Sequence, residues 1–435
     1  MDKALLHWVA DTGRKYGCDD LKVVLLENRR DAMTVRNGQV DKIEHSVSCS
    51  LAIDMFIDGR NGFVYTNNLA TQALEHLIRE GVETTRMLTP DPTRVLADPS
   101  LYYRGGLPDL GIFDENLLDV SPEVKLRMAK DGNAEVAGTN ERIISVETRY
   151  ADNAHESAYL ITNGFEGERR CSRVSLNTLV TINGEGGQHP MDGWGEARLR
   201  FADVPREGIG RRALERALRK VGQRPVGSGR YTMLVEAPVA AHLLQPLYNA
   251  MQGDALQQRM SFLADKMNQP IASPLLHVVD DPLTPGQRGA AYFDSDGVAT
   301  KRRVLFDHGV LRTFFIDTSN ALKLNMAPTT QGIHHTVLSP GTKGLPALIA
   351  DASKAILVTD FNGGNCDPST GKFSYGIEGF LIENGVIVQP VSGMNITGDM
   401  LTLWRNLADV GNDADPWEAD LVPTLVFEDV EFSGV

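Results

Sequence analysis

The side chains of this chain that could bind a metal ion or act as nucleophiles include ten histidines and four cysteines. His334 and His335 are adjacent and precede Thr336-Val337-Leu338, a run of strand-forming residues. Neighbouring side chains of an extended segment point to opposite faces, so these two imidazoles are not expected to bind one metal ion. Because a metal site needs three or four converging groups, we expect the pair to be hydrogen-bonded within the structure or to contact substrate in a groove.

His242 and Cys366, which precedes Asp367, are further candidates, but neither has a partner at the spacing of metal ligands. The cysteines are scattered without a Cys-x-x-Cys pair, which favours reduced thiols and excludes a zinc ribbon that could be identified from sequence. The chain also lacks a Gly-x-Ser-x-Gly elbow, a P-loop and a dinucleotide-binding fingerprint. These absences argue against a serine hydrolase, a nucleotide hydrolase and a Rossmann enzyme.

The most informative segment is glycine-rich and has the sequence FNGGNCDPSTGKFS, from Phe361 to Ser374. It is followed by an apolar run that ends in Asn384-Gly385. Paired glycines and the Pro-Ser-Thr-Gly turn set backbone turns at fixed offsets. The pattern predicts a loop that is shaped around a ligand or a partner.

This segment resembles the C-terminal signature of the TldD/PmbA family, whose members carry paired glycines, a Ser/Thr-Gly-x-Phe-Ser turn and an Ile-Glu-Asn-Gly strand. Shorter matches lie at residues 162–167, 193–194, 294–298, 306–311, 396–398 and 410–413. The resemblance covers nearly the whole chain, which is identified as a member of this family. Membership implies peptide processing or degradation and the family's inherited label, modulator of DNA gyrase.

The peptidase branch of that family carries His-Glu-x-x-x-His on a helix, which gives two imidazole ligands and a carboxylate base, and a later cysteine as third ligand. Aligned on the Gly-Asp pair that follows the motif, this chain carries Leu244, Gln245 and Asn249 at the three positions. Leucine cannot bind zinc, glutamine cannot act as a base, and the asparagine amide is a poor zinc ligand. Pro246 also removes a helical hydrogen bond, and no cysteine follows the Val-Gly-Asn-Asp run at 410–413.

The resemblance therefore implies the PmbA/TldE-type branch, with no catalytic residue, metal ligand or cofactor of its own. The expected partner is a TldD-like homologue that bears zinc, in a heterodimer, or a second copy of the chain in a homodimer. Extended peptide substrate would pair with main chain near the groove candidates, which are Gly363, Gly364, Tyr375, His334 and His335. Two alternatives stay open: an autonomous metallopeptidase with unrecognised ligands, and a non-proteolytic binding protein that acts on gyrase.

Composition limits the number of domains, the cellular location and the kinds of partner that are expected. The chain has 435 residues, 42% of them hydrophobic, which predicts two or three folded domains. It shows no signal-peptide pattern at residues 1–8 and no apolar run of about 20 residues, so a cytoplasmic protein without membrane contact is expected. Its net charge of −14 would repel a phosphate backbone. The basic run at 211–220 has Ala and Leu at helical spacing, so its arginines are expected on a solvated helix face, and nucleic acid is not an expected partner.

The pattern of expected helices and strands that must position these residues predicts an α+β fold. Residues 1–222 are expected to form an N-terminal α+β domain with a mixed sheet and helices, and a proline-rich stretch suggests a subdomain break at about 88–120. Residues 223–435 are expected to form a β-rich domain with a few helices. Specific expectations are a hairpin around Asn37-Gly38, helices at 69–78 and 122–130, a strand meander at 143–201, and strands at 231–235, 275–279, 311–316 and 355–359.

Overall fold

A long hairpin forms the base of the N-terminal half in the computed structural model, which describes residues 1–434. Strand β1 (Asp20–Arg36) turns at Asn37-Gly38 into strand β2 (Gln39–Ile57). Asn37 has a φ of 50° and Gly38 a φ of 79°, the two positive values that a type I′ turn requires. The hairpin predicted from sequence is confirmed.

Six antiparallel strands make up the N-terminal sheet, in the order β3-β2-β1-β4-β5-β6. The remaining bounds are β3 (Arg60–Thr66), β4 (Ile143–Ile161), β5 (Phe165–Ile182) and β6 (Met191–Arg198). The expected α+β class is confirmed, but the mixed sheet expected here is wrong. Short turns follow β1, β2 and β4, and they force antiparallel neighbours because parallel pairing needs a long crossover. Strand β4 also pairs with β1 in antiparallel orientation.

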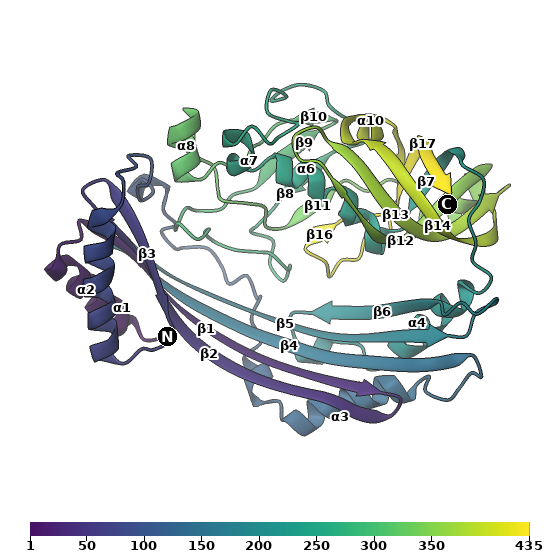
Figure 1. Ribbon diagram of the computed structural model, residues 1–435, viewed down its shortest axis with the longest axis horizontal. Coiled ribbons are helices and arrows are strands. Elements are labelled where there is room, and N and C mark those ends of the chain that lie inside the picture. Colours follow the sequence, from purple (N-terminus) through teal and green to yellow (C-terminus); the bar gives the residue numbers. More distant parts are fainter. Residues whose placement is uncertain (435) are drawn as a thin grey trace.

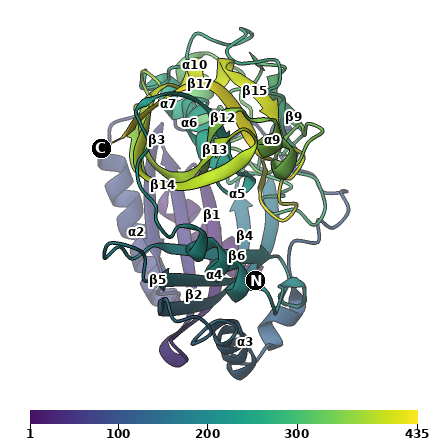
Figure 2. The ribbon, with the colours of Figure 1, turned by 90° about the vertical axis from the view of Figure 1, so that its right-hand side faces the viewer.

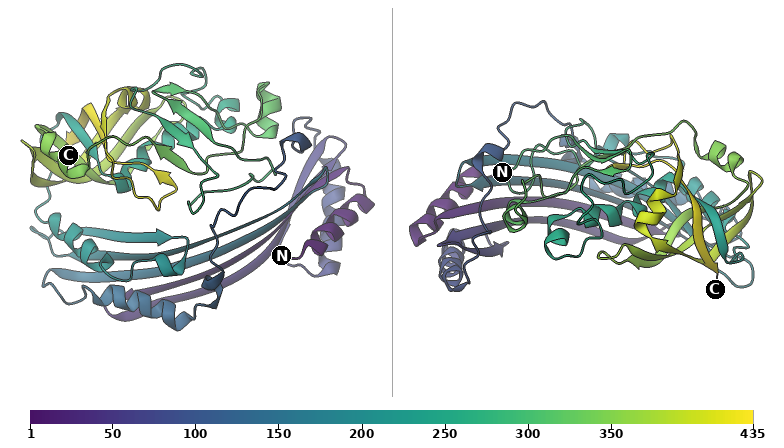
Figure 3. Two further views of the ribbon diagram at one scale, coloured as in Figure 1. Left: turned by 180° about the vertical axis from the view of Figure 1, so that it is seen from behind. Right: turned by 90° about the horizontal axis from the view of Figure 1, so that it is seen from above.

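The two faces of this sheet are buried by different parts of the chain (Figures 1 and 3). One face packs against helices: Val23 and Leu25 of β1 lie in a core with α1 and α2, and Met33 lies in a core with α3. On the opposite face, Val24 packs in a cluster with Phe293 from the C-terminal half, as the alternation of strand side chains requires. The helices are α1 (Lys3–Tyr16), α2 (Thr71–Met87), α3 (Pro122–Ala134) and α4 (Ile209–Arg219), with short 3-10 turns at Pro99–Leu101, Glu115–Asp119 and Phe201–Asp203.

Helix α4 follows the N-terminal sheet and touches both halves of the molecule. Its small residues Ala213 and Ala217 are buried against the sheet, as expected. The prediction of a solvated basic face is wrong for Arg216 and Lys220. Arg216 pairs with Asp192 of β6 and with Glu236, and Lys220 pairs with Asp192 and Glu378 of the C-terminal half.

The C-terminal half contains a curved six-stranded sheet that closes on itself (Figure 2). Its order is β14-β13-β12-β7-β17-β15, and an additional pairing of β14 with β17 joins five of the strands into a ring. Its bounds are β7 (Gly229–Val235), β12 (Lys354–Cys366), β13 (Lys372–Glu383), β14 (Val386–Asp399), β15 (Leu407–Val410) and β17 (Leu425–Gly434). Closure leaves an apolar interior that includes Met233, Ile356 and Trp404.

A second, smaller sheet has the order β10-β9-β8-β11-β16. Its strands are β8 (Val278–Asp280), β9 (Arg303–Asp307), β10 (Val310–Leu311), β11 (Thr336–Leu338) and β16 (Asp420–Leu421). The helices of this half are α5 (Ala237–Ala240), α6 (Gln245–Ala250), α7 (Gly253–Gln257), α8 (Thr318–Leu324), α9 (Leu345–Asp351) and α10 (Met400–Arg405), with a 3-10 turn at Ala241–Leu243.

Two strand predictions and one loop prediction in the C-terminal half need correction. The strands expected at 275–279 and 311–316 overlap only β8 and β10, which are short strands of the smaller sheet. The glycine-rich segment, expected as a loop, continues β12 to Cys366 and turns only afterwards, because bulges at its glycines let it stay paired with β13. No helix within residues 1–434 is long and apolar enough to cross a membrane.

We predict that Lys220→Met lowers the free energy of unfolding by about 3 kcal/mol, because it leaves Glu378 without its cation and Asp192 with Arg216 alone. Burial lowers the pKa of Lys220, but the charges and hydrogen bonds of Asp192 and Glu378 outweigh it and leave this pKa above 10.5. A raised lysine pKa stabilises the fold below the pKa of the unfolded chain, and that contribution is lost as the pH rises through the folded pKa. Urea unfolding of variant and wild type should therefore differ at neutral pH and converge above pH 10.5.

Arg230→Met is the control, since Arg230 and its partner Asp429 are both more than half exposed. Exposed pairs contribute at most about 1 kcal/mol. If the Lys220 variant were no less stable than this control, the network would not hold the two halves together.

Candidate functional site

The positions aligned with the zinc motif lie in a run of short helical turns after β7. Leu244 ends this run before α6 and is fully buried in the apolar core of the C-terminal half. Gln245 and Asn249 lie on α6 and are exposed. Pro246 lies in the first turn of α6, where a residue's N–H has no acceptor within the helix, so the expected loss of a helical hydrogen bond does not occur. The segment is thus well folded, and it presents amides rather than imidazoles.

His242 joins this segment to the glycine-rich strand. Its ring stacks on Phe361 of β12, with ring centroids 4.5 Å apart and planes at 17°, and meets Tyr375 of β13 edge-on at 4.9 Å. Burial lowers the pKa of His242, and the Asp360 carboxylate partly offsets this effect. The ring is therefore held neutral and serves here as an aromatic contact.

Gly363 and Gly364 lie in the exposed part of β12, and their surroundings differ. Gly363 has a φ of 148°, and a Cβ there would meet no atom within 4 Å. Gly364 has a φ of 102°, and a Cβ there would lie 1.9 Å from the backbone oxygen of Ser374 on β13. Gly364 is therefore required by strand pairing, whereas Gly363 faces open space.

One edge of this part of β12 has no strand beside it. Strand β7 pairs with β12 only from Ala355 to Val358, after which Glu236 N donates to Val358 O and the chain turns into α5. In the described part of the chain, residues 361–366 pair with β13 alone. Their other edge leaves backbone groups available for an incoming strand.

Tyr375 lies in the same hairpin, but its side chain is only 4% exposed. Burial raises the pKa of its hydroxyl to about 12. Cys366 ends β12, and burial, with help from the Asp367 and Asp399 carboxylates, raises the pKa of its thiol to about 11. At neutral pH this thiol stays protonated and is a poor nucleophile and metal ligand.

His334 and His335 precede β11 in the smaller sheet, so they lie in a different sheet from the glycines. His335 is buried, and its Nδ1 lies 2.8 Å from the carbonyl oxygen of Ala419. The Nδ1 of His334 lies 3.6 Å from an oxygen of Asp280, whose other oxygen accepts the backbone N–H groups of both histidines. The 3.6 Å contact of His334 is too long for a hydrogen bond, so its Nδ1 has no hydrogen-bond partner among the described residues, whereas His335 has one; the role of the pair in a groove stays a prediction.

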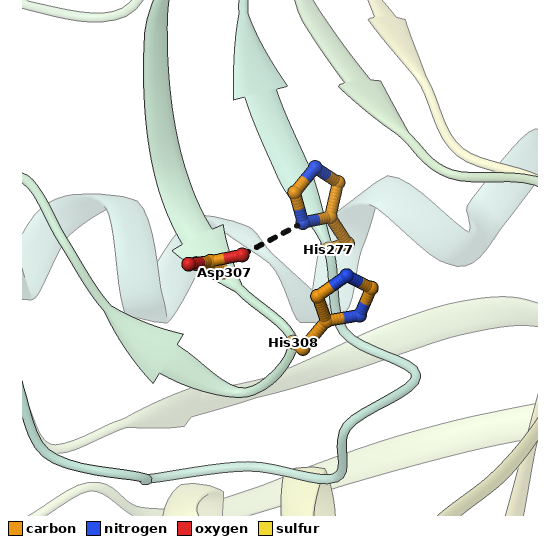
Figure 4. Close-up of side chains that lie close together, drawn as sticks. All are labelled: His277, Asp307 and His308. Carbon is orange, nitrogen blue, oxygen red and sulfur yellow. Dashed lines mark ion pairs between the residues drawn. The ribbon is translucent and has the colours of Figure 1, made fainter.

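The cluster that does converge was missed from sequence. His277, Asp307 and His308 bring one ring nitrogen each and a carboxylate oxygen within 4.8 Å of one another (Figure 4). Asp307 and His308 are adjacent in the sequence, but His277 is thirty residues upstream. Only the pairing of β8 with β9 brings them together, and no sequence signal predicts that pairing.

Three domain models of one family match the chain and together span most of it. They are described as PmbA/TldA metallopeptidase domain 1 (residues 22–85), central domain (115–221) and C-terminal domain (228–434). Among curated proteins, the Metalloprotease PmbA of Escherichia coli O157:H7 is 25% identical over 405 residues, which cover 91% of this chain and 88% of that protein.

Solved structures agree with this assignment. A protein of Bacteroides thetaiotaomicron described as a candidate modulator of DNA gyrase is 46% identical, with a TM-score of 0.98 and full coverage of both chains. TldE from Thermococcus kodakarensis shares the fold, with a TM-score of 0.87, 20% identity, and coverage of 99% of this chain and 100% of that one. The family suspected from the glycine-rich signature is confirmed: the chain belongs to the TldD/PmbA family.

Proposed function

We propose that this chain is a PmbA/TldE-type subunit that takes part in peptide processing or degradation without a catalytic zinc of its own. The observation that carries the proposal is the chemistry of Leu244, Gln245 and Asn249, which offer no imidazole and no carboxylate at the motif positions. Leu244 is also enclosed by the apolar core, so this position serves packing. A zinc-bearing TldD-type homologue would then supply the metal and the activated water.

The segment that follows residues 410–413 supports the same proposal. The third zinc ligand of the peptidase branch is expected just after residues 410–413, where this chain has no cysteine. Both carboxylate oxygens of Asp413 accept hydrogen bonds, from the backbone N–H and the hydroxyl of Thr424. This carboxylate therefore organises the local turn and is not available to replace the cysteine.

The free edge of β12 suggests how the subunit would hold a peptide. An extended peptide can add to an exposed strand edge through main-chain hydrogen bonds, which makes binding tolerant of side-chain identity. The edge at 361–366 adjoins His242, so the proposed peptide site lies against the segment that carries the replaced motif. We place this assembly in the cytoplasm, as a heterodimer with the zinc-bearing homologue or as a homodimer.

A second candidate function is action on DNA gyrase without proteolysis. It is favoured by the description of the Bacteroides thetaiotaomicron relative, which is 46% identical over its whole length. The net charge of −14 argues that such an action would go through protein contact rather than DNA contact.

We predict that the chain alone does not cleave unfolded peptides and that a mixture with its zinc-bearing homologue does. The physical reason is that hydrolysis needs a Lewis acid and an activated water, which the motif positions of this chain cannot hold. Mass spectrometry of a casein digest, with and without chelator, measures this. Chelator-sensitive cleavage by this chain alone would contradict the subunit proposal.

We predict different outcomes for substitutions at the two glycines. Gly364→Val should lower the melting temperature by several degrees, because its Cβ meets the backbone of β13. Gly363→Val should cost about 1–3 kcal/mol through its positive φ and should weaken peptide or partner binding, because the new side chain projects at the free strand edge.

Gly393→Val in β14 is the matched control for Gly363→Val. Gly393 also has a positive φ, 64°, and open space around its Cβ, but it lies outside the proposed edge. Calorimetry should find normal binding in this control. Equal affinities of the Gly363 and Gly393 variants would show that the edge of β12 is not the binding surface.

We predict that DNA does not retain the chain, at low or at moderate salt. Electrostatic repulsion from a phosphate backbone strengthens as salt falls, so an acidic surface gives no retention in the range where basic proteins bind most strongly. Retention on immobilised duplex DNA that weakens steeply with salt would instead show a segregated basic face and favour a direct DNA-binding function.

A further inference from the structure

The cluster of His277, Asp307 and His308 lies in the smaller sheet of the C-terminal half, on elements that do not carry the replaced zinc motif. His277 directly precedes β8, Asp307 ends β9, and His308 begins the turn to β10. The Nδ1 of His277 is 3.6 Å from Oδ1 of Asp307, and the two imidazole rings have centroids 4.8 Å apart (Figure 4).

The nitrogen of His277 that faces this cluster lacks a hydrogen-bond partner. It is shielded from solvent, and the 3.6 Å that separates it from Asp307 is too long for a hydrogen bond. A buried polar atom without a partner is costly and calls for an explanation such as a bound ion. A cation held between the imidazole and the carboxylate would satisfy both.

His308 is held in the state that a metal ligand needs. Its Nδ1 lies 3.2 Å from the carbonyl oxygen of Pro274. Because a carbonyl oxygen only accepts hydrogen bonds, this contact places the proton on Nδ1 and leaves the lone pair on Nε2. Histidines that bind metals usually donate their second ring N–H to such a backbone carbonyl.

His308 and Gly309 form the two-residue turn between β9 and β10. His308 has a φ of 48° and Gly309 a φ of 82°, values that glycine or asparagine adopts more readily than histidine. The backbone N–H of Gly309 donates to Leu276 O, and its carbonyl accepts from Ile271 N, so the turn is tied to the segment that carries His277. These are the values of a type I′ turn between β9 and β10, as at Asn37-Gly38, so the turn fixes the position from which the His308 side chain projects.

The type of ligand atom selects the ion. Two imidazoles and one carboxylate suit zinc and similar divalent transition metals, whereas magnesium and calcium prefer oxygen alone. Arg312 contacts Oδ2 of Asp307 at 3.3 Å, which leaves Oδ1 directed to His277. Ligands of tetrahedral zinc lie about 3.4 Å apart, so the three ligand atoms, which lie within 4.8 Å of one another, would draw closer together around the ion.

We propose that His277, Asp307 and His308 form a binding site for a divalent transition-metal ion of the zinc class. All three side chains are partly exposed, so the ion exchanges with solvent, and three protein ligands leave a coordination position for water. This site departs from the expectation that the chain carries no metal ligands, and it does not depend on the proposed subunit function.

The test is a calorimetric titration of the EDTA-treated full-length chain with Zn²⁺ alone. We expect one equivalent to bind, and a rise in melting temperature with zinc, since an ion that binds the folded state stabilises it. His277→Ala and His308→Asn should each weaken zinc binding at least about tenfold. Asparagine tolerates a positive φ, so His308→Asn removes the imidazole and keeps the turn.

His242→Ala and His334→Ala are the controls, because they remove histidines outside the cluster, and they should bind zinc as the wild type does. The proposal is overturned if the wild type binds no zinc, or if folded His277→Ala and His308→Asn proteins bind it with wild-type affinity. The titration uses this chain alone, so its outcome is independent of whether a mixture with the homologue cleaves peptides.

Discussion

The structure depends on a network of buried charges at the junction of its two halves. Asp192 of the N-terminal sheet contacts Arg216 of α4 and Lys220, the residue that follows this helix. These two cations also reach Glu236 and Glu378 of the C-terminal half. Burial raises the pKa of Glu236, and Arg216 partly offsets that rise, so this carboxylate is tolerated only with its partner in place. Such pairs add little stability compared with apolar packing, but breaking one is costly, which makes the relative position of the halves specific.

The position of the replaced motif follows from this junction. Glu236 is the residue between β7 and α5, so the ion pair with Arg216 fixes the start of the helical run that leads to Leu244 and α6. The oxygen of Thr359 on β12 also accepts from Arg216, close to where β12 loses β7 as a neighbour. The same arginine therefore positions both walls of the proposed peptide site.

The glycine-rich signature has a structural explanation in the closed sheet. Strand β12 must bend sharply to close the ring, and its pairing with β13 shifts register twice, between Val358 and Asp360 and between Phe361 and Gly363. Glycines permit this, since a Cβ on Gly364 or Gly379 would lie within 2 Å of a backbone oxygen on the neighbouring strand. Part of the family signature therefore specifies a fold, and of its paired glycines Gly363 is the one whose surroundings are open.

Local patterns were readable from the sequence where the local signal was strong. The turn at Asn37-Gly38, the helix that begins at Pro122 and the apolar face of α4 needed only turn chemistry and periodicity. The burial of Lys220 and the cluster at His277 were not readable, because both depend on contacts between segments far apart in the chain, Glu378 in one case and Asp307 in the other. The sequence shows the type of each side chain, but it does not show which distant residues that side chain contacts.

Leu244 shows why the absence of the motif is more than an exchange of surface residues. A buried leucine contributes about 1.5–3 kcal/mol through burial, and this one belongs to the same apolar core as Met233 and Ile356 of the closed sheet. Histidine at this position would have to be buried in that core with a polar ring that needs hydrogen-bond partners. Regaining a zinc site would therefore require repacking around α6 as well as new ligands, whereas the proposed site at His277 uses partly exposed side chains and a turn that is already in place. The packing at the motif position and the proposed metal site are thus physically separate, and each can change without the other.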